Sequence, residues 1–271
     1  MPRLIAPPGA CDTHIHIYEP GYAVAPTAVV QPVMAPTSAY LEARARIGIE
    51  RTVIVQPSAY GTDNSCLLAA LEEMGPTARG VAVVDTSVDD GELERLTEAG
   101  VRGIRFFMLP GGVLPWDILE TMAARVHGFG WHVQLQLDGR LLPERAQMLM
   151  DLPCRLVIDH VGKFLEPVPT SHPGFRVLLR LVEDGRTWVK LAAPYETSKV
   201  GPPGYDDVAT LAKALVKAAP HRMLWASNWP HPQARPTPDD GKMLDLLLDW
   251  APNEAERHRI LVDNPEELYG F

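Results

Sequence analysis

Three histidines and one asparagine stand where their side chains could do chemistry. His14 and His16 alternate along a short apolar segment, so in an extended strand both side chains face the same side. Such a pair can hold a metal ion or form hydrogen bonds to a substrate. His160 ends another apolar segment, and Asn228 lies between two tryptophans, just before a proline. We expect His14, His16, His160 and Asn228 to be catalytic and Asp12 to be a structural partner.

A second group of residues has the character of a substrate-binding set. Arg105 lies inside an apolar segment, and a buried guanidinium needs an anionic partner from either the protein or a substrate. Lys163, three residues after His160, offers a second anion contact. No GxSxG motif surrounds Ser58, which argues against a serine-hydrolase triad. The predicted substrate-binding residues are Ser58, Tyr60, Arg105, Gln136, Lys163, Tyr195 and His231.

Eight short apolar segments would have to position these side chains. The predicted strands cover residues 10–17, 52–56, 80–84, 103–107, 132–136, 155–160, 187–191 and 222–226. Amphipathic segments alternate with them, for example 37–47, 117–129, 203–218 and 241–250, as expected for parallel strands covered by helices. Eight such units favour a closed (β/α)₈ TIM barrel over an open doubly wound sheet. We predict one domain over residues 1–271, with its chemistry at the carboxyl ends of the strands.

Composition narrows the possible partners. The formal net charge of −9 and the absence of a basic run argue against nucleic-acid binding. No apolar run approaches the length of a membrane span, and no signal-peptide-like run occurs at the N-terminus. Cys11, Cys66 and Cys154 have neither disulfide nor zinc-site spacing, which is typical of a cytoplasmic protein. No glycine-rich phosphate loop follows the first strand, so we expect a small-molecule substrate and no nucleotide cofactor.

The order of the motifs resembles that of the amidohydrolase superfamily. More narrowly, it is similar to the branch that contains 2-pyrone-4,6-dicarboxylate lactonase and D-galactarolactone isomerase. The motifs are the histidine pair, Ser58-x-Tyr60-Gly61-Thr62-Asp63-Asn64, Arg102-Gly103-Ile104-Arg105-Phe106, Asp159-His160-x-Gly162-Lys163 and Ser227-Asn228-Trp229-Pro230-His231. They span nearly the whole chain. The resemblance implies a (β/α)₈ barrel with the histidine pair on the first strand.

The resemblance also implies what this chain lacks. Most superfamily members end the eighth strand with an aspartate that acts as the general base for hydrolytic water, and Asn228 stands there. Metal-dependent members commonly use a lysine or glutamate on the fourth strand and histidines on the fifth and sixth. This chain has Arg105 on the fourth strand and the glutamines Gln134 and Gln136 on the fifth. Because the lactonase branch is described as working without metal, we expect no metal ion.

A site that polarises a lactone carbonyl but lacks a base for water favours a nucleophile already present in the substrate. A base typically contributes about 10²–10⁴-fold to such a step. Intramolecular attack reaches effective molarities of about 10⁵–10⁸ M. Within the branch that the sequence resembles, this favours the isomerase, so the resemblance implies conversion of D-galactaro-1,5-lactone to the 1,4-lactone by attack of a neighbouring hydroxyl. The alternatives are a lactone hydrolase of the pyrone type and a non-catalytic barrel that binds a sugar acid.

Overall fold

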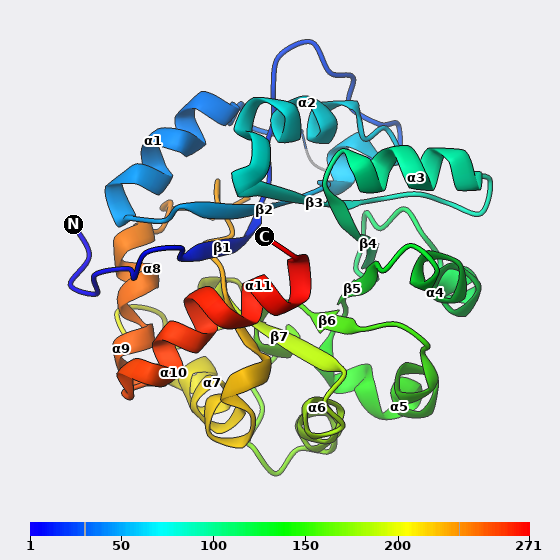
Figure 1. Ribbon diagram of the computed structural model, residues 1–271. Helices are drawn as coiled ribbons and strands as arrows, with labels where there is room; N and C mark the ends of the chain where they lie inside the picture. The colour runs from blue at the N-terminus through cyan, green and yellow to red at the C-terminus, as the bar shows by residue number, and fades with distance from the viewer. Residues whose placement is uncertain (30, 233) are drawn as a thin grey trace.

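Eight parallel strands form one sheet in which each strand pairs with the next along the chain (Figure 1). The computed structural model describes residues 1–29, 31–232 and 234–271. The strands are β1 (Cys11–Ile15), β2 (Arg51–Val55), β3 (Ala78–Ala82), β4 (Val101–Phe107), β5 (His132–Gln136), β6 (Leu156–Ile158), β7 (Thr187–Leu191) and β8 (Met223–Trp225). The segment after β8 closes the sheet. The backbone N–H of Asn228 donates to the His14 carbonyl at 3.0 Å, and the backbone N–H of His16 donates to the Trp229 carbonyl at 2.8 Å. The predicted (β/α)₈ barrel is confirmed, and the open sheet is wrong.

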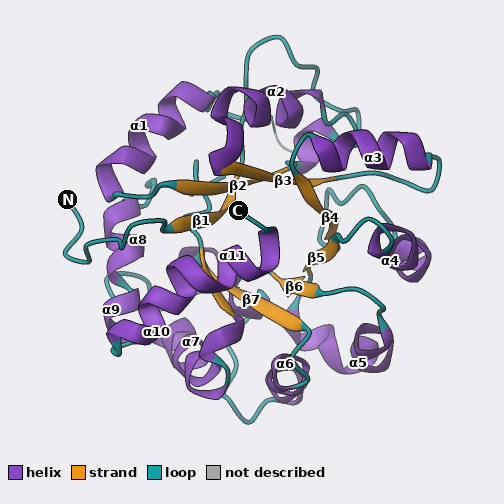
Figure 2. Ribbon diagram, in the orientation of Figure 1, coloured by secondary structure: helices purple, strands orange, loops and turns teal. Residues whose placement is uncertain are grey.

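Helices surround the strands as an outer layer, except for α11, which crosses one end of the barrel (Figure 2). They are α1 (Thr37–Ile47), α2 (Ser65–Met74), α3 (Asp90–Glu98), α4 (Leu119–His127), α5 (Leu142–Asp151), α6 (Pro173–Glu183), α7 (Asp206–Ala218), α8 (Asp240–Asp245), α9 (Leu247–Trp250), α10 (Glu254–His258) and α11 (Asn264–Tyr269). Several boundaries differ from the sequence prediction by one to three residues; for example, the helix expected over 117–129 is α4. Helix α7 begins three residues later than expected, because Tyr205 has a left-handed φ of 50° that an α-helix excludes. The expected helix over 241–250 is divided into α8 and α9.

One end of the barrel is closed by apolar side chains. Cys11, Val53, Val81 and other inward residues form a cluster with Leu268 and Tyr269 of α11. Figure 1 shows α11 crossing this end of the sheet. Because the floor is packed, the inward polar residues gather at the carboxyl ends of the strands, as expected for this fold.

The segment over residues 19–36 is a loop, apart from Val30, which lies outside the described residues. The two ends of this loop are joined by a pair of backbone hydrogen bonds of 3.0 Å between Tyr18 and Ala35. The three cysteines are buried and free, as their spacing predicts. Within residues 1–29, 31–232 and 234–271, no helix combines the length and apolar character needed to span a bilayer.

Candidate active site

The His14 and His16 side chains both point into the barrel, as the strand periodicity predicts. Their Nε2 atoms lie 3.3 Å apart, and both residues are buried. Asp12, the expected structural partner, accepts from the backbone amide of Ser227 at 2.9 Å and so ties β1 to the end of β8. His16 Nδ1 lies 2.8 Å from the Val55 carbonyl oxygen. A carbonyl only accepts, so Nδ1 of His16 carries the hydrogen and its Nε2 offers a lone pair.

Lys190 of β7 contacts His14. This lysine is fully buried, and its ammonium donates to the Thr13 carbonyl and to Gln134 Oε1, both at 2.7 Å. It also lies 3.3 Å from His14 Nδ1. Asp159 Oδ1, which only accepts, is at the same distance of 3.3 Å from this nitrogen, so these two contacts do not decide the tautomer. The lone pair of His16 Nε2, 3.3 Å from His14 Nε2, requires the hydrogen of His14 on Nε2, and His14 Nδ1 then accepts from Lys190. A directed hydrogen-bond chain therefore runs from Lys190 through His14 to His16.

Asp159 balances the charge of Lys190. It is fully buried, accepts from Gln134 Nε2 at 3.1 Å, and its Oδ1 lies 3.8 Å from Lys190 Nζ. The His160 ring follows directly, with its centroid 4.9 Å from that of His14. His160 Nδ1 has no hydrogen-bond partner among the described residues. The structure thus brings the three predicted histidines together at one place.

The three histidines are neutral at physiological pH. Burial lowers the pKa of His14 and of His160 well below the usual value. Burial also lowers the pKa of His16 to about 3, and that of Lys190 to about 8. The site therefore presents a neutral N–H group at His14 Nε2 and a neutral acceptor at His16 Nε2, rather than imidazolium cations.

These pKa shifts predict that acid destabilises the fold. In the unfolded chain, histidines take up protons as the pH falls below about 6.5. In the folded chain, buried His14, His16, His132 and His160 resist protonation, since burial lowers all four pKa values. The unfolded state then binds more protons, so the free energy of unfolding decreases as the pH falls from about 6.5 toward 3.

One group opposes this trend. Burial raises the pKa of Asp12 to about 6, so the folded state binds that proton first. Four groups outweigh one, and we expect the urea midpoint to be lower at about pH 5 than at about pH 7. A midpoint that stays the same or rises on acidification would contradict neutral buried histidines.

The spacing of the histidines would suit a zinc ion, but their surroundings do not. Possible ligand atoms of His14, Asp159 and His160 lie within 4.8 Å of one another. However, with Lys190 donating to its Nδ1, His14 turns a hydrogen toward His16 instead of a lone pair. Asp159 Oδ1 lies 3.3 Å from Nδ1 of His14, on the side of the ring away from His16. A cation here would also face the buried ammonium. The hydrogen on His14 Nε2 and the neighbouring ammonium both disfavour a cation at this position.

Arg105 offers unused donors to an anion. It is 5% exposed. Its Nη1 donates to the Gln56 carbonyl at 2.8 Å, whereas the contact from Nη2 to Gln136 Oε1 is long at 3.5 Å. Its Nε has no partner among the described residues. Ser58 and Phe107 line a small cavity together with this side chain. The arrangement suits a carboxylate, which a guanidinium binds through two parallel hydrogen bonds.

A second polar network lies beyond β7 and β8. Asn228 Nδ2 donates to the Tyr195 hydroxyl at 2.9 Å and to Glu196 Oε1 at 3.2 Å. The other oxygen of Glu196 forms an ion pair with Lys163. His231 Nδ1 lies 2.9 Å from the Tyr195 hydroxyl. Glu196, which the sequence did not indicate, therefore joins Asn228 to Lys163 and neutralises the charge of Lys163. Asn228 also connects to Tyr195, and through Tyr195 to His231.

Tyr60, a predicted substrate-binding residue, contacts the loop after β1. Its hydroxyl donates to the Glu19 carbonyl at 3.4 Å, and its ring packs between Tyr18 and Tyr22 with centroid distances of 5.9 and 6.2 Å. These contacts support the loop after β1. Of this group, Tyr18 approaches the histidines, with its ring centroid 6.3 Å from that of His16.

Several of these residues have a left-handed backbone conformation, which sets the direction of their side chains. His160, Val161, Lys163, Asn228 and His231 have φ values of 53°, 55°, 46°, 64° and 61°. Each costs roughly 1–2 kcal/mol for a non-glycine residue, and a β-branched valine is an outlier there. Strain of this kind clusters at functional sites. The turns after β6 and β8 are thus held by their surroundings in conformations that direct His160 and Asn228 into the barrel.

Glu196 and Asp240 are site residues that sequence reasoning missed. Glu196 follows Tyr195 directly, so its place after a strand was an available signal. Asp240 Oδ1 lies 2.8 Å from His231 Nε2. In the sequence, Asp239 and Asp240 have the pattern of a helix start. That pattern does not indicate that Asp240 also contacts His231. Lys190 was not among the predicted site residues, and the structure shows its contact with His14.

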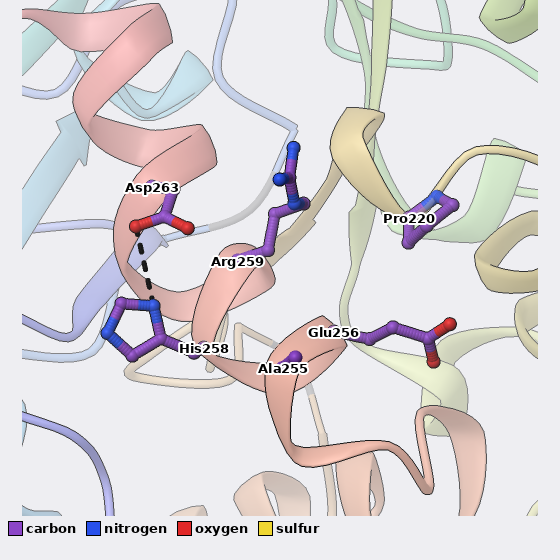
Figure 3. Close-up of a pocket in the computed structure, with 6 residues that line it drawn as sticks. All are labelled: Pro220, Ala255, Glu256, His258, Arg259 and Asp263. Atoms are coloured by element: carbon purple, nitrogen blue, oxygen red, sulfur yellow. Dashed lines mark ion pairs between the residues drawn. The ribbon is translucent and has the colours of Figure 1, made fainter.

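A surface hollow elsewhere is not part of this site. Figure 3 shows its lining residues, Pro220, Ala255, Glu256, His258, Arg259 and Asp263. Pro220 precedes β8, whereas the candidate site follows the strands, so the hollow lies toward the opposite end of the barrel. Its one drawn ion pair joins His258 and Asp263 at 3.3 Å, and both side chains are about half exposed.

Comparisons with known proteins agree with this architecture. The amidohydrolase family model matches residues 11–271. D-galactarolactone isomerase of Agrobacterium fabrum is 38% identical over 99% of this chain and 93% of its own length. 2-Pyrone-4,6-dicarboxylate hydrolase of Comamonas testosteroni is 34% identical over 99% and 92%. A crystal structure of an Agrobacterium tumefaciens protein without ligand has 37% identity and a TM-score of 0.95, covering 100% of this chain and 99% of that one.

Proposed function

The chain belongs to the amidohydrolase family, and from that membership we propose that it is a lactone isomerase that works without metal. Its substrate would be D-galactaro-1,5-lactone and its product the 1,4-lactone. The names of two relatives, an isomerase and a hydrolase of lactones, support a lactone as substrate. The observation that carries the choice of isomerase is Asn228, whose amide stands where a hydrolase would need a base.

Charge supports a substrate with one carboxylate. Among the described residues around the site, Lys163 pairs with Glu196, and Lys190 is balanced by Asp159. Arg105 is left with an unbalanced positive charge and an unpaired Nε. D-Galactaro-1,5-lactone has one free carboxylate, whereas 2-pyrone-4,6-dicarboxylate has two.

The tautomers give the histidines different roles. The substrate carboxylate binds at Arg105, and the lactone carbonyl oxygen, where negative charge develops, shares the His14 Nε2–H with His16 Nε2. Neutral His16 cannot donate from Nε2, so it accepts a hydrogen bond and orients His14 or the substrate. His160 contacts His14 and completes the polar lining. The C4 hydroxyl then attacks the carbonyl carbon, and the tetrahedral intermediate collapses with cleavage of the bond to the original ring oxygen.

Water attacks the same carbonyl more slowly than the C4 hydroxyl does. A hydroxyl held beside its target acts with an effective molarity of about 10⁵–10⁸ M. Water at the position of Asn228 meets an amide that donates to Tyr195 and Glu196 and accepts no proton. Isomerisation therefore precedes hydrolysis.

Proton NMR of D-galactaro-1,5-lactone with chelator-treated enzyme tests this proposal. We expect the 1,4-lactone to form faster than in buffer, without free galactarate. Added zinc should not raise the rate. A rate that depends on zinc would overturn the metal-free mechanism but leave the reaction intact.

The second candidate function is a lactone hydrolase, which the 34% identity to the Comamonas enzyme favours. Titration of released acid separates the two, because an isomerase releases none. A barrel that binds the lactone tightly but turns over none would be non-catalytic, and both proposals would then fail.

Replacing Arg105 with alanine should weaken substrate binding more than it slows the chemical step. Loss of one partner of a buried charge pair costs about 2–5 kcal/mol, so KM is expected to rise about 10²-fold while kcat changes much less. Arg102→Ala is the matched control on the same strand, because its guanidinium donates to the Thr97 carbonyl away from the site. An unchanged KM in Arg105→Ala would remove Arg105 as the carboxylate anchor.

A further inference from the structure

We infer that Tyr195, His231 and Asp240 form a proton relay, which takes the proton from the attacking hydroxyl and returns it to the departing ring oxygen. This inference rests on the proposed isomerisation, because that reaction moves one proton between neighbouring substrate oxygens. The amide of Asn228, which follows the eighth strand, cannot accept that proton. The relay supplies a group that can.

The three side chains are in hydrogen-bonding contact. Tyr195 O lies 2.9 Å from His231 Nδ1, and His231 Nε2 lies 2.8 Å from Asp240 Oδ1. The side chain of His231 is 1% exposed, and that of Asp240 is 18% exposed. Tyr195 is only partly buried as a residue. The relay therefore has a sheltered centre, with the tyrosine at the end nearest Asn228.

Their hydrogen bonds run in one direction. Asn228 contacts the Glu196 carboxylate and the Tyr195 oxygen through the same amide nitrogen, and a carboxylate only accepts. That nitrogen therefore donates to Tyr195, whose own O–H is left to donate to His231 Nδ1. His231 then carries its hydrogen on Nε2 and donates it to Asp240. This is the polarity of a catalytic triad, in which a carboxylate holds the histidine tautomer.

The proton steps balance over the reaction. As the C4 oxygen bonds to the carbonyl carbon, its proton moves to Tyr195 O, and the tyrosine proton moves to His231 Nδ1. Asp240 stabilises the imidazolium that results. When the bond from the carbonyl carbon to the original ring oxygen breaks, both protons move back, and that oxygen becomes a hydroxyl. No proton is exchanged with a further reactant.

The surroundings of Tyr195 favour such a concerted transfer. Burial and the neighbouring charge of Glu196 raise the pKa of Tyr195 well above its usual value. The tyrosine therefore keeps a proton at neutral pH and releases one only as it gains another. Asp240, Glu196 and Tyr205 are the charged or titratable groups that act on it.

Asp240 is not needed to begin helix α8. The cap of that helix is Asp239, whose side chain accepts from the Lys242 amide at 2.9 Å. The two neighbouring aspartates thus have different tasks, which provides a matched pair of variants. Asp239→Asn keeps a residue that caps well, whereas Asp240→Asn changes the group that faces His231.

The test compares Tyr195→Phe, Asp240→Asn and Asp239→Asn in the lactone NMR assay. We expect kcat to fall about 10²–10⁴-fold in Tyr195→Phe with little change in KM. The kcat of Asp240→Asn should fall by a similar factor. An asparagine amide can donate to His231 Nε2, which permits the tautomer with the hydrogen on Nδ1. Asp239→Asn should keep nearly full activity. Full activity in Tyr195→Phe would overturn the relay.

Two measurements that do not rest on those rates alone complete the test. Nitrogen NMR of His231 in the wild type should show the hydrogen on Nε2, and a hydrogen on Nδ1 would overturn the relay even if a variant failed to fold. The wild-type rate in mixtures of light and heavy water should curve, as expected for two protons in motion, and a linear dependence would contradict it. A wild type that only hydrolyses the lactone would defeat the proposed isomerase, and the same variants would then test the relay on water.

Discussion

Replacing Lys190 with methionine is expected to lower the free energy of unfolding by about 3–5 kcal/mol. The cause is Asp159, which lies 3.8 Å from Lys190 Nζ and is fully buried. Methionine fills most of the lysine volume but leaves this carboxylate without its cation, and an uncompensated buried charge is costly. Gln134 would also lose the donor that now bonds its oxygen at 2.7 Å.

A double variant identifies the cause of that loss. In Lys190→Met/Asp159→Asn both charges are gone, so we expect much of the stability to return, as measured by urea unfolding of both variants. Lys213→Met is the matched control, because Lys213 and Asp249 form an exposed pair at 2.8 Å, and such pairs contribute about 0–1 kcal/mol. If the double variant were no more stable than Lys190→Met, the buried ion pair would not be the reason.

The same substitution should also disturb the site itself. Without the ammonium, His14 Nδ1 loses a donor at 3.3 Å, and the tautomer then rests on the contact with His16 alone. The N–H that polarises the lactone carbonyl is then no longer assured. We therefore expect kcat to fall in the double variant even where its stability is restored.

Replacing Asn228 with aspartate should introduce lactone hydrolysis. We expect a large increase in the hydrolysis rate only when Glu196 is replaced as well. Asn228 Nδ2 lies 3.2 Å from Glu196 Oε1, so an aspartate at 228 would place two carboxylates side by side. Like charges at that distance raise the pKa of one of them, and a protonated acid is a poor base. We expect Asn228→Asp/Glu196→Gln to release galactarate about 10²-fold faster than the wild type.

The control is Glu196→Gln alone, whose amide oxygen can still accept from Lys163 and which supplies no base. It should isomerise the lactone and release no more acid than the wild type. If neither Asn228→Asp nor the double variant hydrolysed the lactone faster, the explanation of Asn228 as a missing base would lose its main support.

Much of the fold was accessible from local pattern. The alternation of apolar strands with amphipathic helices predicted all eight strands, because burial on both faces of a parallel strand leaves a recognisable apolar run. The boundaries shifted by one to three residues where the local backbone decided, as at Tyr205 before α7. Closure was not local, since it depends on bonds between the segment after β8 and β1.

The candidate site divides in the same way. Periodicity alone placed His14 and His16 on one inward face, and charge alone marked Arg105 as a buried cation in need of a partner. The sequence did not show that Glu196 joins Lys163 to Asn228, or that Asp240 meets His231. These contacts join residues in different loops, and residue types by themselves do not reveal which loops meet.

What the sequence determined by itself was the strand and helix order and the set of inward polar side chains, because both follow from periodicity over a few residues. What only the tertiary structure decided was which of those side chains can accept or donate a proton. The tautomer of His16, and through it that of His14, depends on the Val55 carbonyl, which belongs to the neighbouring strand and lies 2.8 Å from His16 Nδ1. A hydrogen-bond donor is defined by its partners, and the fold brings those partners together.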